Sequence, residues 1–271
     1  MKKQLTGEHF NGCSYWVRGE GEPILLLHGF AEDHSIWEHQ TLLLSENFRV
    51  IVPDLPGSGT SPLPNEKLSI ERLSDFVFEI MDAEGLSRAL VFGHSMGGYI
   101  ALAMSEAKPE KITGLGLIHS TAFADDELKK DNRRKSIRLI EHDGKAVFLK
   151  AMIPNLYSES SRNSIPNSIQ NHLNLALDTN TESLINYYQA MIDRPDRCHI
   201  LHQSQFPCLI VAGTEDNAVP VSQSLQMASM PACCDFHLLA ETGHTSMIEC
   251  PDTLNFILNK FCEYVYDLKN R

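Results

Sequence analysis

Short runs of apolar residues without polar alternation recur along the chain, and they constrain its fold more than any other feature. Stretches with helical spacing of apolar residues separate these runs. A strand that is buried on both faces has this kind of run, and strands that alternate with helices are typical of a parallel sheet. We therefore predict an α/β fold with buried strands at residues 24–27, 50–52, 89–92, 115–118, 208–212 and 236–239.

Three flanking segments support this prediction. Apolar residues within 70–81 fall on one helical face, and Ser69 is placed to cap the first turn. The stretch 254–265 repeats the pattern, and Pro251 is a favourable first helical residue. Residues 13–18 lie between two glycine-containing turns, which is typical of one arm of an antiparallel hairpin.

The charge balance of the chain excludes several partners. Among 271 residues, 35 acidic side chains exceed 23 basic ones, so the net charge is −12. A surface of that sign repels phosphate backbones and anionic lipids, and we expect neither a nucleic-acid nor a membrane partner. Basic residues cluster between Lys129 and Lys135, but acidic residues precede and interrupt them. We therefore expect this cluster on the solvated face of a helix.

The sequence also bears on the compartment. No apolar stretch approaches the ~20 residues that a membrane span needs, and the first residues have no apolar run that would mark a signal peptide. The seven cysteines are an odd set without a C-x-x-C pair. They predict reduced thiols and a cytoplasmic protein.

The alternation of strands and helices stops between residues 120 and 205. Helical patterns broken by three prolines fill this segment. We therefore predict a core of residues 1–119 and 206–271, with residues 120–205 inserted as a helical subdomain. Its apolar stripes need a surface to cover, and the mouth of the sheet is the candidate.

The strongest chemical signal is the pentapeptide Gly-His-Ser-Met-Gly at residues 93–97. It follows a buried run and precedes a helix-compatible stretch. A serine on a sharp turn from strand to helix has its hydroxyl lifted out of the sheet, and the flanking glycines avoid collisions with neighbouring backbone. The helix N-terminus behind the serine also favours developing negative charge. We predict that Ser95 is a nucleophile.

A serine hydroxyl is a weak nucleophile at neutral pH, so it needs a base that a carboxylate orients. Asp216 and His244 each follow one of the apolar runs. They are therefore expected at the carboxyl ends of strands, at the same sheet edge as Ser95. Glu215 is one residue off, and Asp235 precedes its strand instead of following it. The order Ser, Asp, His is the one used by this type of strand-to-helix nucleophile turn.

Acyl transfer also needs two N–H donors for the oxyanion. Met96, directly after the serine, is the candidate for one, and Phe30, in the loop after the first apolar run, is the candidate for the other. The substrate pocket is expected between this turn and the helical insertion, lined by Phe30, Met96, Trp37, His119, Phe123 and Met152. Its Met and aromatic side chains predict an apolar acyl or alcohol group.

Taken together, these segments resemble the α/β-hydrolase superfamily, in its capped branch of serine esterases, lipases and C–C hydrolases. The resemblance covers essentially the whole chain and rests on His28-Gly29-Phe30 with Trp37, residues 53–61, residues 93–98, residues 213–220 and Gly243-His244. It implies a mostly parallel eight-stranded sheet flanked by helices, with a helical cap inserted after the sixth strand. It also implies that the glycine-rich residues 57–61 are a structural turn, and they lack the lysine of a phosphate-binding loop.

The prediction is a serine hydrolase that cleaves a small carboxylic ester through an acyl-enzyme. This chemistry requires no metal and no cofactor, and His199 and His202 are a weak ligand pair expected on a helix surface. Two alternatives use the same triad: a C–C bond hydrolase and a lyase of the menaquinone pathway. The lyase branch usually has an arginine where this chain has Tyr99. A receptor with slow turnover is an alternative of another class.

Overall fold

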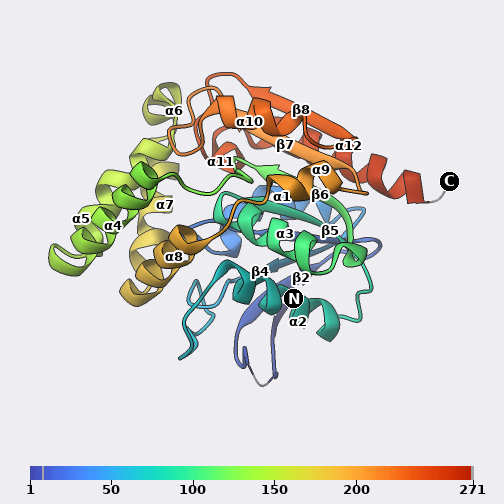
Figure 1. The fold of residues 1–271 in the computed structure, drawn as a ribbon, viewed down its shortest axis with the longest axis horizontal. Helices are drawn as coiled ribbons and strands as arrows, with labels where there is room; N and C mark the ends of the chain where they lie inside the picture. The colour runs from blue at the N-terminus through green and yellow to red at the C-terminus, as the bar shows by residue number, and fades with distance from the viewer. Residues whose placement is uncertain (8, 270–271) are drawn as a thin grey trace.

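The computed structural model describes residues 1–7 and 9–269. These residues form an eight-stranded sheet with helices on both faces (Figure 1). The spatial order is β1-β2-β4-β3-β5-β6-β7-β8, in which β1 pairs with β2 and β2 with β4 antiparallel, and all other pairs are parallel. The strands are β1 (Lys2–Gln4), β2 (Ser14–Arg18), β3 (Pro23–Leu27), β4 (Arg49–Pro53), β5 (Ala89–His94), β6 (Ile112–Ile118), β7 (Cys208–Gly213) and β8 (Cys234–Leu239). The predicted α/β fold with a mostly parallel eight-stranded sheet is confirmed.

Each of the six predicted runs lies within a strand, but burial on both faces is wrong for the last one. The first five strands of this set, from β3 to β7, are almost fully buried. β8 is partly exposed, and Leu238 has 43% of its surface exposed. The reason is its place at the sheet edge, where it has a neighbour on one side and less helix cover than β7.

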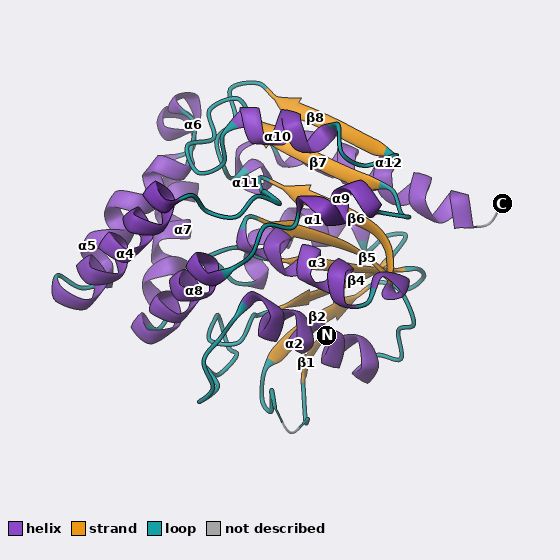
Figure 2. Ribbon diagram, in the orientation of Figure 1, coloured by secondary structure: helices purple, strands orange, loops and turns teal. Residues whose placement is uncertain are grey.

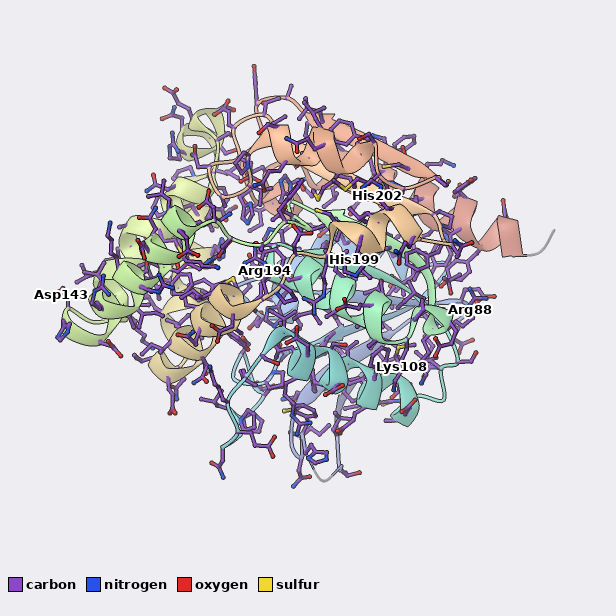
Figure 3. All side chains as sticks on the ribbon, in the orientation of Figure 1. Arg88, Lys108, Asp143, Arg194, His199 and His202 are labelled. Atoms are coloured by element: carbon purple, nitrogen blue, oxygen red, sulfur yellow. The ribbon has the colours of Figure 1, made fainter. Side chains whose placement is uncertain are left out.

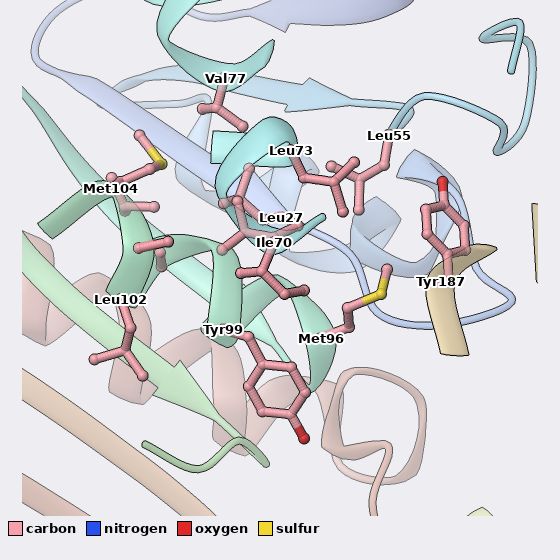
Figure 4. Packing of buried hydrophobic residues seen from close by; sticks show 14 of the residues in the cluster. Leu27, Leu55, Ile70, Leu73, Val77, Met96, Tyr99, Leu102, Met104 and Tyr187 are labelled. Carbon is pink, nitrogen blue, oxygen red and sulfur yellow. The ribbon is translucent and has the colours of Figure 1, made fainter. Parts of the chain in front are cut away.

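Alternate side chains of the strands supply two cores. On β5, Val91 packs into the core beneath α2 (Ile70–Ala83) and α3 (Met96–Ala107), while Leu90 and Phe92 pack into the core on the opposite face. Figure 4 shows the first core, with side chains of α2 and α3 packed around Leu27. The remaining core helices are α1 (Glu38–Leu44), α10 (Val221–Ala228), α11 (Ser246–Glu249), α12 (Pro251–Lys269) and the 3-10 turns η1 (His34–Trp37) and η2 (Pro109–Lys111).

The predicted signals at helix ends are confirmed for the two long core helices. The Ser69 hydroxyl accepts a hydrogen bond from the Arg72 N–H and so caps α2. α12 begins at Pro251 and covers the second face of the sheet. The predicted hairpin arm is also confirmed, because β2 pairs antiparallel with β1, with Lys3 opposite Tyr15.

The segment between β6 and β7 is helical, and it divides into two groups (Figure 2). The first group lies beyond the carboxyl ends of the parallel strands. It consists of α4 (Glu127–His142), α5 (Lys145–Met152), η3 (Ile153–Leu156), α6 (Glu159–Ser164), α7 (Pro166–Asp178) and α8 (Thr181–Asp193). It is tied to the core by the Tyr187 hydroxyl, which donates to the Pro56 carbonyl at 2.7 Å. α9 (Cys198–Gln203) packs against α3 instead. The predicted division into a core and a cap of residues 120–205 stays a proposal. α9 lies within this range but packs against the core helix α3.

Among the described residues, no helix is both long and apolar enough to cross a membrane. The seven cysteines, all within the described part of the chain, are free thiols.

Candidate active site

Ser95 occupies a strained turn between β5 and α3. Its φ of +49° lies in the left-handed region, which non-glycine residues rarely adopt. Two hydrogen bonds hold this conformation: the Ser95 N–H donates to the Ile118 carbonyl at 3.0 Å, and the Ser120 hydroxyl donates to the Ser95 carbonyl at 2.7 Å. The serine is therefore fixed at the first turn of α3, where the helix dipole favours negative charge.

The glycines of the pentapeptide are required by close backbone packing. A Cβ on Gly93 would lie 2.3 Å from the Gly97 backbone, and a Cβ on Gly97 would lie 2.3 Å from the Leu27 carbonyl oxygen. Both distances are shorter than any side chain tolerates. β3, the turn and α3 consequently approach one another in a way that larger residues would prevent.

Asp216 and His244 meet at the same sheet edge. Asp216 follows β7, His244 follows β8, and the His244 Nδ1 lies 2.8 Å from Asp216 Oδ2 and 3.0 Å from Oδ1. The N–H groups of Ala218 and Val219 donate to Asp216 Oδ1 at 2.8 and 2.9 Å. Because the carboxylate accepts from Nδ1–H, the His244 Nε2 is left as a proton acceptor. Ser95 and His244 line the same cavity.

The electrostatics of Asp216 favour its charged form. Burial by itself would raise the pKa of Asp216, but His244 and His119 outweigh burial and hold this pKa well below its ordinary value. The neighbouring Glu215 has another partner, since its carboxylate accepts from the Glu159 N–H at the start of α6 at 2.9 Å. The structure therefore brings Asp216, and not Glu215, to His244.

A second buried histidine–carboxylate pair lies beneath the first, and the sequence analysis missed it. His94 Nδ1 lies 2.9 Å from Glu32 Oε2, and His94 Nε2 lies 2.9 Å from the His244 carbonyl oxygen. Both partners are acceptors, so His94 donates from both nitrogens and is an imidazolium. Burial opposes this charge, but Glu32 raises the pKa of His94, and His94 helps to lower the pKa of Glu32 to about 2 against the effect of burial. In the sequence, the one sign of this pair was that His94 directly precedes Ser95.

The loop after β3 is built around His28 and carries Phe30. His28 Nε2 accepts from the Leu55 N–H at 3.0 Å, and its Nδ1 lies 2.8 Å from the Gly29 carbonyl. The Phe30 N–H donates to no acceptor among the described residues. Met96 is the first residue of α3, a position whose N–H has no intrahelical acceptor. The two N–H groups predicted for the oxyanion are thus available to a ligand.

A cavity of about 540 Å³ lies between this sheet edge and the cap helices. Phe30 and Met152 line it as predicted, together with Leu156, Tyr188, Met191, Val219 and Pro220. Phe30 stacks on Tyr188 with ring centroids 4.3 Å apart, so an aromatic contact joins core and cap at the cavity wall. This wall can receive an apolar part of a substrate.

Four residues predicted for the pocket do not line it. Met96 is fully buried in the core beneath α2 and α3. Trp37 is fully buried in the core on the opposite sheet face, because its turn continues directly into α1. His119 lies behind Asp216, with Nδ1 3.3 Å from Asp216 Oδ2 and Nε2 2.8 Å from the Ser246 hydroxyl oxygen. Phe123 packs, half-buried, against the core beneath α3. The predictions for Met96, Trp37, His119 and Phe123 as lining residues are wrong, since position in the chain alone did not give the direction of their side chains.

The basic cluster on α4 also differs from the prediction of a solvated face. Lys129 and Arg133 line the cavity, and the Arg133 side chain is only 13% exposed. Lys130 and Arg134 do not line the cavity and form ion pairs with Glu127 and Asp131, and the Arg134 side chain is 45% exposed. One turn of the helix thus carries two of its cations inward, because α4 packs with that side toward α8 and the cavity.

Two groups of residues in the described chain have metal-ligating atoms close together: His119, Asp216 and His244, and Asp33, His34 and Asp54. Hydrogen bonds within the protein already engage each group. His34 Nδ1 lies 2.7 Å from Asp54 Oδ1, and Asp33 accepts from the N–H and hydroxyl of Ser35. Neither Asp33 nor His34 lines the active-site cavity. His199 and His202 lie on the exposed side of α9, as expected (Figure 3).

A family model described as the alpha/beta hydrolase fold matches residues 22–251. The chain therefore belongs to the alpha/beta hydrolase fold family and is an enzyme of that family. A Caulobacter segnis protein named as a carbamate hydrolase, RutD, is 27% identical to it over 271 residues, which cover 96% of this chain and 99% of the relative.

Two solved structures are similar over nearly the full length. An esterase from Thermogutta terrifontis, solved with malate bound, has a TM-score of 0.90 and 28% identity, with 98% of each chain covered. The enol-lactonase from Burkholderia xenovorans has a TM-score of 0.86 and 24% identity, with 93% of this chain and 98% of the other covered. The second likeness is one of fold.

Proposed function

We propose that this protein is a carboxylic ester hydrolase that works through an acyl-enzyme on Ser95. The observation that carries the proposal is the Asp216–His244 pair, which leaves Nε2 of His244 free as a base at the cavity that Ser95 lines. The esterase and carbamate hydrolase names of the relatives agree with acyl transfer as the reaction class.

The proposed reaction begins when His244 Nε2 removes the Ser95 hydroxyl proton as Ser95 Oγ attacks the ester carbonyl. The resulting oxyanion accepts from the N–H groups of Phe30 and Met96. Asp216 stabilises the imidazolium that forms on His244. When the tetrahedral intermediate collapses, His244 gives the proton to the leaving alcohol and the acyl group stays on Ser95.

Water completes the cycle. His244 Nε2 takes a proton from the water molecule, whose oxygen attacks the acyl carbonyl. Collapse of the second intermediate returns the proton to Ser95 Oγ and releases the carboxylic acid. The buried imidazolium of His94 assists as a positioning residue, because it donates to the His244 carbonyl and so fixes the backbone that carries the base.

The experiment is labelling with a fluorophosphonate, followed by intact-mass measurement, beside steady-state hydrolysis of p-nitrophenyl esters of increasing acyl length. We expect one adduct on the wild type and none on Ser95→Ala, together with a loss of turnover of about 10⁴-fold or more. Ser229→Ala, at the exposed end of α10, is the matched control and should label and turn over normally. Absence of labelling in the wild type, or near-normal turnover by Ser95→Ala, would disprove the proposal.

A further inference from the structure

One wall of the cavity carries a cation whose hydrogen-bonding capacity is mostly unused. Arg133 donates from Nε to Asp125 Oδ2 at 2.5 Å, and its guanidinium lies 5.5 Å from the ring centroid of Tyr188. The two terminal amino groups of Arg133 have no acceptor among the described residues. Asp125 and Tyr188 therefore fix the guanidinium, while four N–H donors remain for a ligand.

The wall as a whole has an excess of positive charge. Asp125 is fully buried and also faces Arg194 Nη2 at 3.0 Å and Lys129 Nζ at 4.0 Å, so one carboxylate serves three cations. Asp126 lines the cavity as well, but its carboxylate caps α4 by accepting from the Lys129 N–H. Across the cavity, Glu32 is paired with the imidazolium of His94. Positive charge thus exceeds negative charge on the cap side, in a protein whose overall charge is −12.

Tyr99 adds a neutral donor to the same wall. The residue is 3% exposed and lines the cavity, yet its hydroxyl forms no hydrogen bond with the described residues. Arg194 lies where the chain leaves α8 (Figure 3). Its guanidinium is 3.9 Å from the ring centroid of Tyr99. Burial by itself would raise the pKa of Tyr99, but Arg194, Lys129 and Arg133 outweigh it and lower this pKa below its ordinary value. A hydroxyl that faces the cavity without a protein partner, in a positive environment, is suited to an anion.

We propose that the substrate of the Ser95 site carries a carboxylate besides its scissile ester, and that Arg133 binds this carboxylate with help from Tyr99 and Lys129. A guanidinium offers paired N–H groups that match the two oxygens of a carboxylate. Lys129 Nζ donates to the Ala218 carbonyl at 3.0 Å and keeps further protons for the ligand. The inference rests on the proposed ester hydrolysis and narrows its substrates to carboxylic esters that carry an additional carboxylate.

The test compares two p-nitrophenyl esters of similar length, the hexanoate and the adipate monoester, which differ in a terminal carboxylate. We expect the wild type to prefer the adipate monoester in kcat/KM. Arg133→Met should lower kcat/KM for this ester by about tenfold to hundredfold, mainly through KM, and leave the hexanoate within about threefold. Arg138→Met, an exposed change on the same helix, is the matched control and should alter neither.

In Arg133→Met, Asp125 still pairs with Arg194 and Lys129. A second variant tests the inference even if Arg133→Met disturbs the fold. Tyr99→Phe removes only an unpartnered hydroxyl, so it should fold normally and still lose about threefold to tenfold on the adipate monoester alone. Free adipate should inhibit hexanoate hydrolysis competitively in the wild type and more weakly in Arg133→Met. Equal losses on both esters, or a wild type that prefers the hexanoate, would overturn the inference while leaving ester hydrolysis intact. No hydrolysis of either ester and no labelling of Ser95 would instead refute the proposed function.

Discussion

The two sides of the cavity differ in how far their polar groups are satisfied within the protein. On the sheet side, Asp216 accepts hydrogen bonds from a histidine and two backbone N–H groups, and Glu32 and His94 satisfy each other. On the cap side, Arg133 keeps donors without acceptors in the described chain, and Tyr99 reaches the same wall from the core helix α3 with its hydroxyl likewise unpartnered. Saturated groups are held in one geometry whatever ligand is present, whereas unsaturated donors are completed by the ligand. The sheet side is thus suited to catalysing the reaction, and the cap side is suited to selecting the substrate.

The two sides also differ in how they are held. Ser95 and the residues that follow β7 and β8 are fixed by strand pairing, since parallel strands end at a common edge. The cap side depends on helix packing and on a few polar ties such as Tyr187 to the Pro56 carbonyl. Substitutions on the sheet side should therefore change kcat, and substitutions on the cap side should change KM.

The largest effect on the sheet side, apart from loss of Ser95 itself, is expected for Asp216→Asn. The amide can no longer hold His244 with Nδ1 as the donor, so Nε2 ceases to act as the base. We expect kcat to fall by about 10⁴-fold with little change in KM. Steady-state kinetics on the preferred ester measure this.

The matched control for this change is Asp235→Asn. Asp235 lies on β8, half-exposed, and pairs with His237 outside the cavity. It should leave both kinetic constants unchanged. If Asp216→Asn retained more than a tenth of the wild-type kcat, the division of roles between the two sides would be wrong.

A smaller effect is expected for Glu32→Gln, which keeps the shape of the side chain and removes its charge. His94 then loses the anion that sustains its imidazolium, and its bond to the His244 carbonyl weakens. We expect kcat to fall by about tenfold to hundredfold, as for groups that orient a reacting residue. The free energy of unfolding should fall by about 2 kcal/mol near neutral pH.

The pH dependence of this stability difference separates positioning by charge from simple packing. Glu32 has a lowered pKa, so its contribution is complete above its ordinary value of 4.5 and is lost as pH falls to about 2. His94 has a raised pKa, so its contribution is complete below 6.5 and is lost as pH rises through the raised value. Urea unfolding of the wild type and of Glu32→Gln should show the largest difference in the free energy of unfolding between pH 4.5 and pH 6.5. A difference that does not change with pH would indicate packing alone.

The smallest effect is expected for Tyr188→Leu on the cap side. The change removes the stacking on Phe30 and the face on which Arg133 rests. We expect KM to rise by about threefold to tenfold and kcat to stay within about twofold, because the contact is worth roughly 1 kcal/mol. Tyr264→Leu, on the exposed side of α12, is the control. A fall in kcat without a rise in KM would show that this contact shapes the catalytic side.

Local sequence patterns predicted the positions of strands, turns and helices correctly, but they did not predict the direction of several side chains. The run at 89–92 and the pentapeptide after it located a strand, a turn and a helix, because each depends on neighbours in the sequence. The solvated α4 face failed, since charge interruption says which residues are polar and not which way the helix is rotated. The prediction for Trp37 was wrong for the same reason. Its loop was placed correctly, but its side chain packs into the core on the opposite face of the sheet.

The sequence by itself determined which apolar runs form the parallel strands, where the serine turn lies and which carboxylate and histidine follow neighbouring strands. Burial, turn chemistry and strand order depend on short segments of the chain, and for this reason they can be predicted locally. Only the tertiary structure decided that His94 joins Glu32 beneath His244, and that Arg133 and Tyr99 face the same cavity. These groups come from separate elements, and their pairing depends on how the helices pack and rotate. Packing of that kind is a property of the whole core, to which each residue contributes only a small part of the free energy.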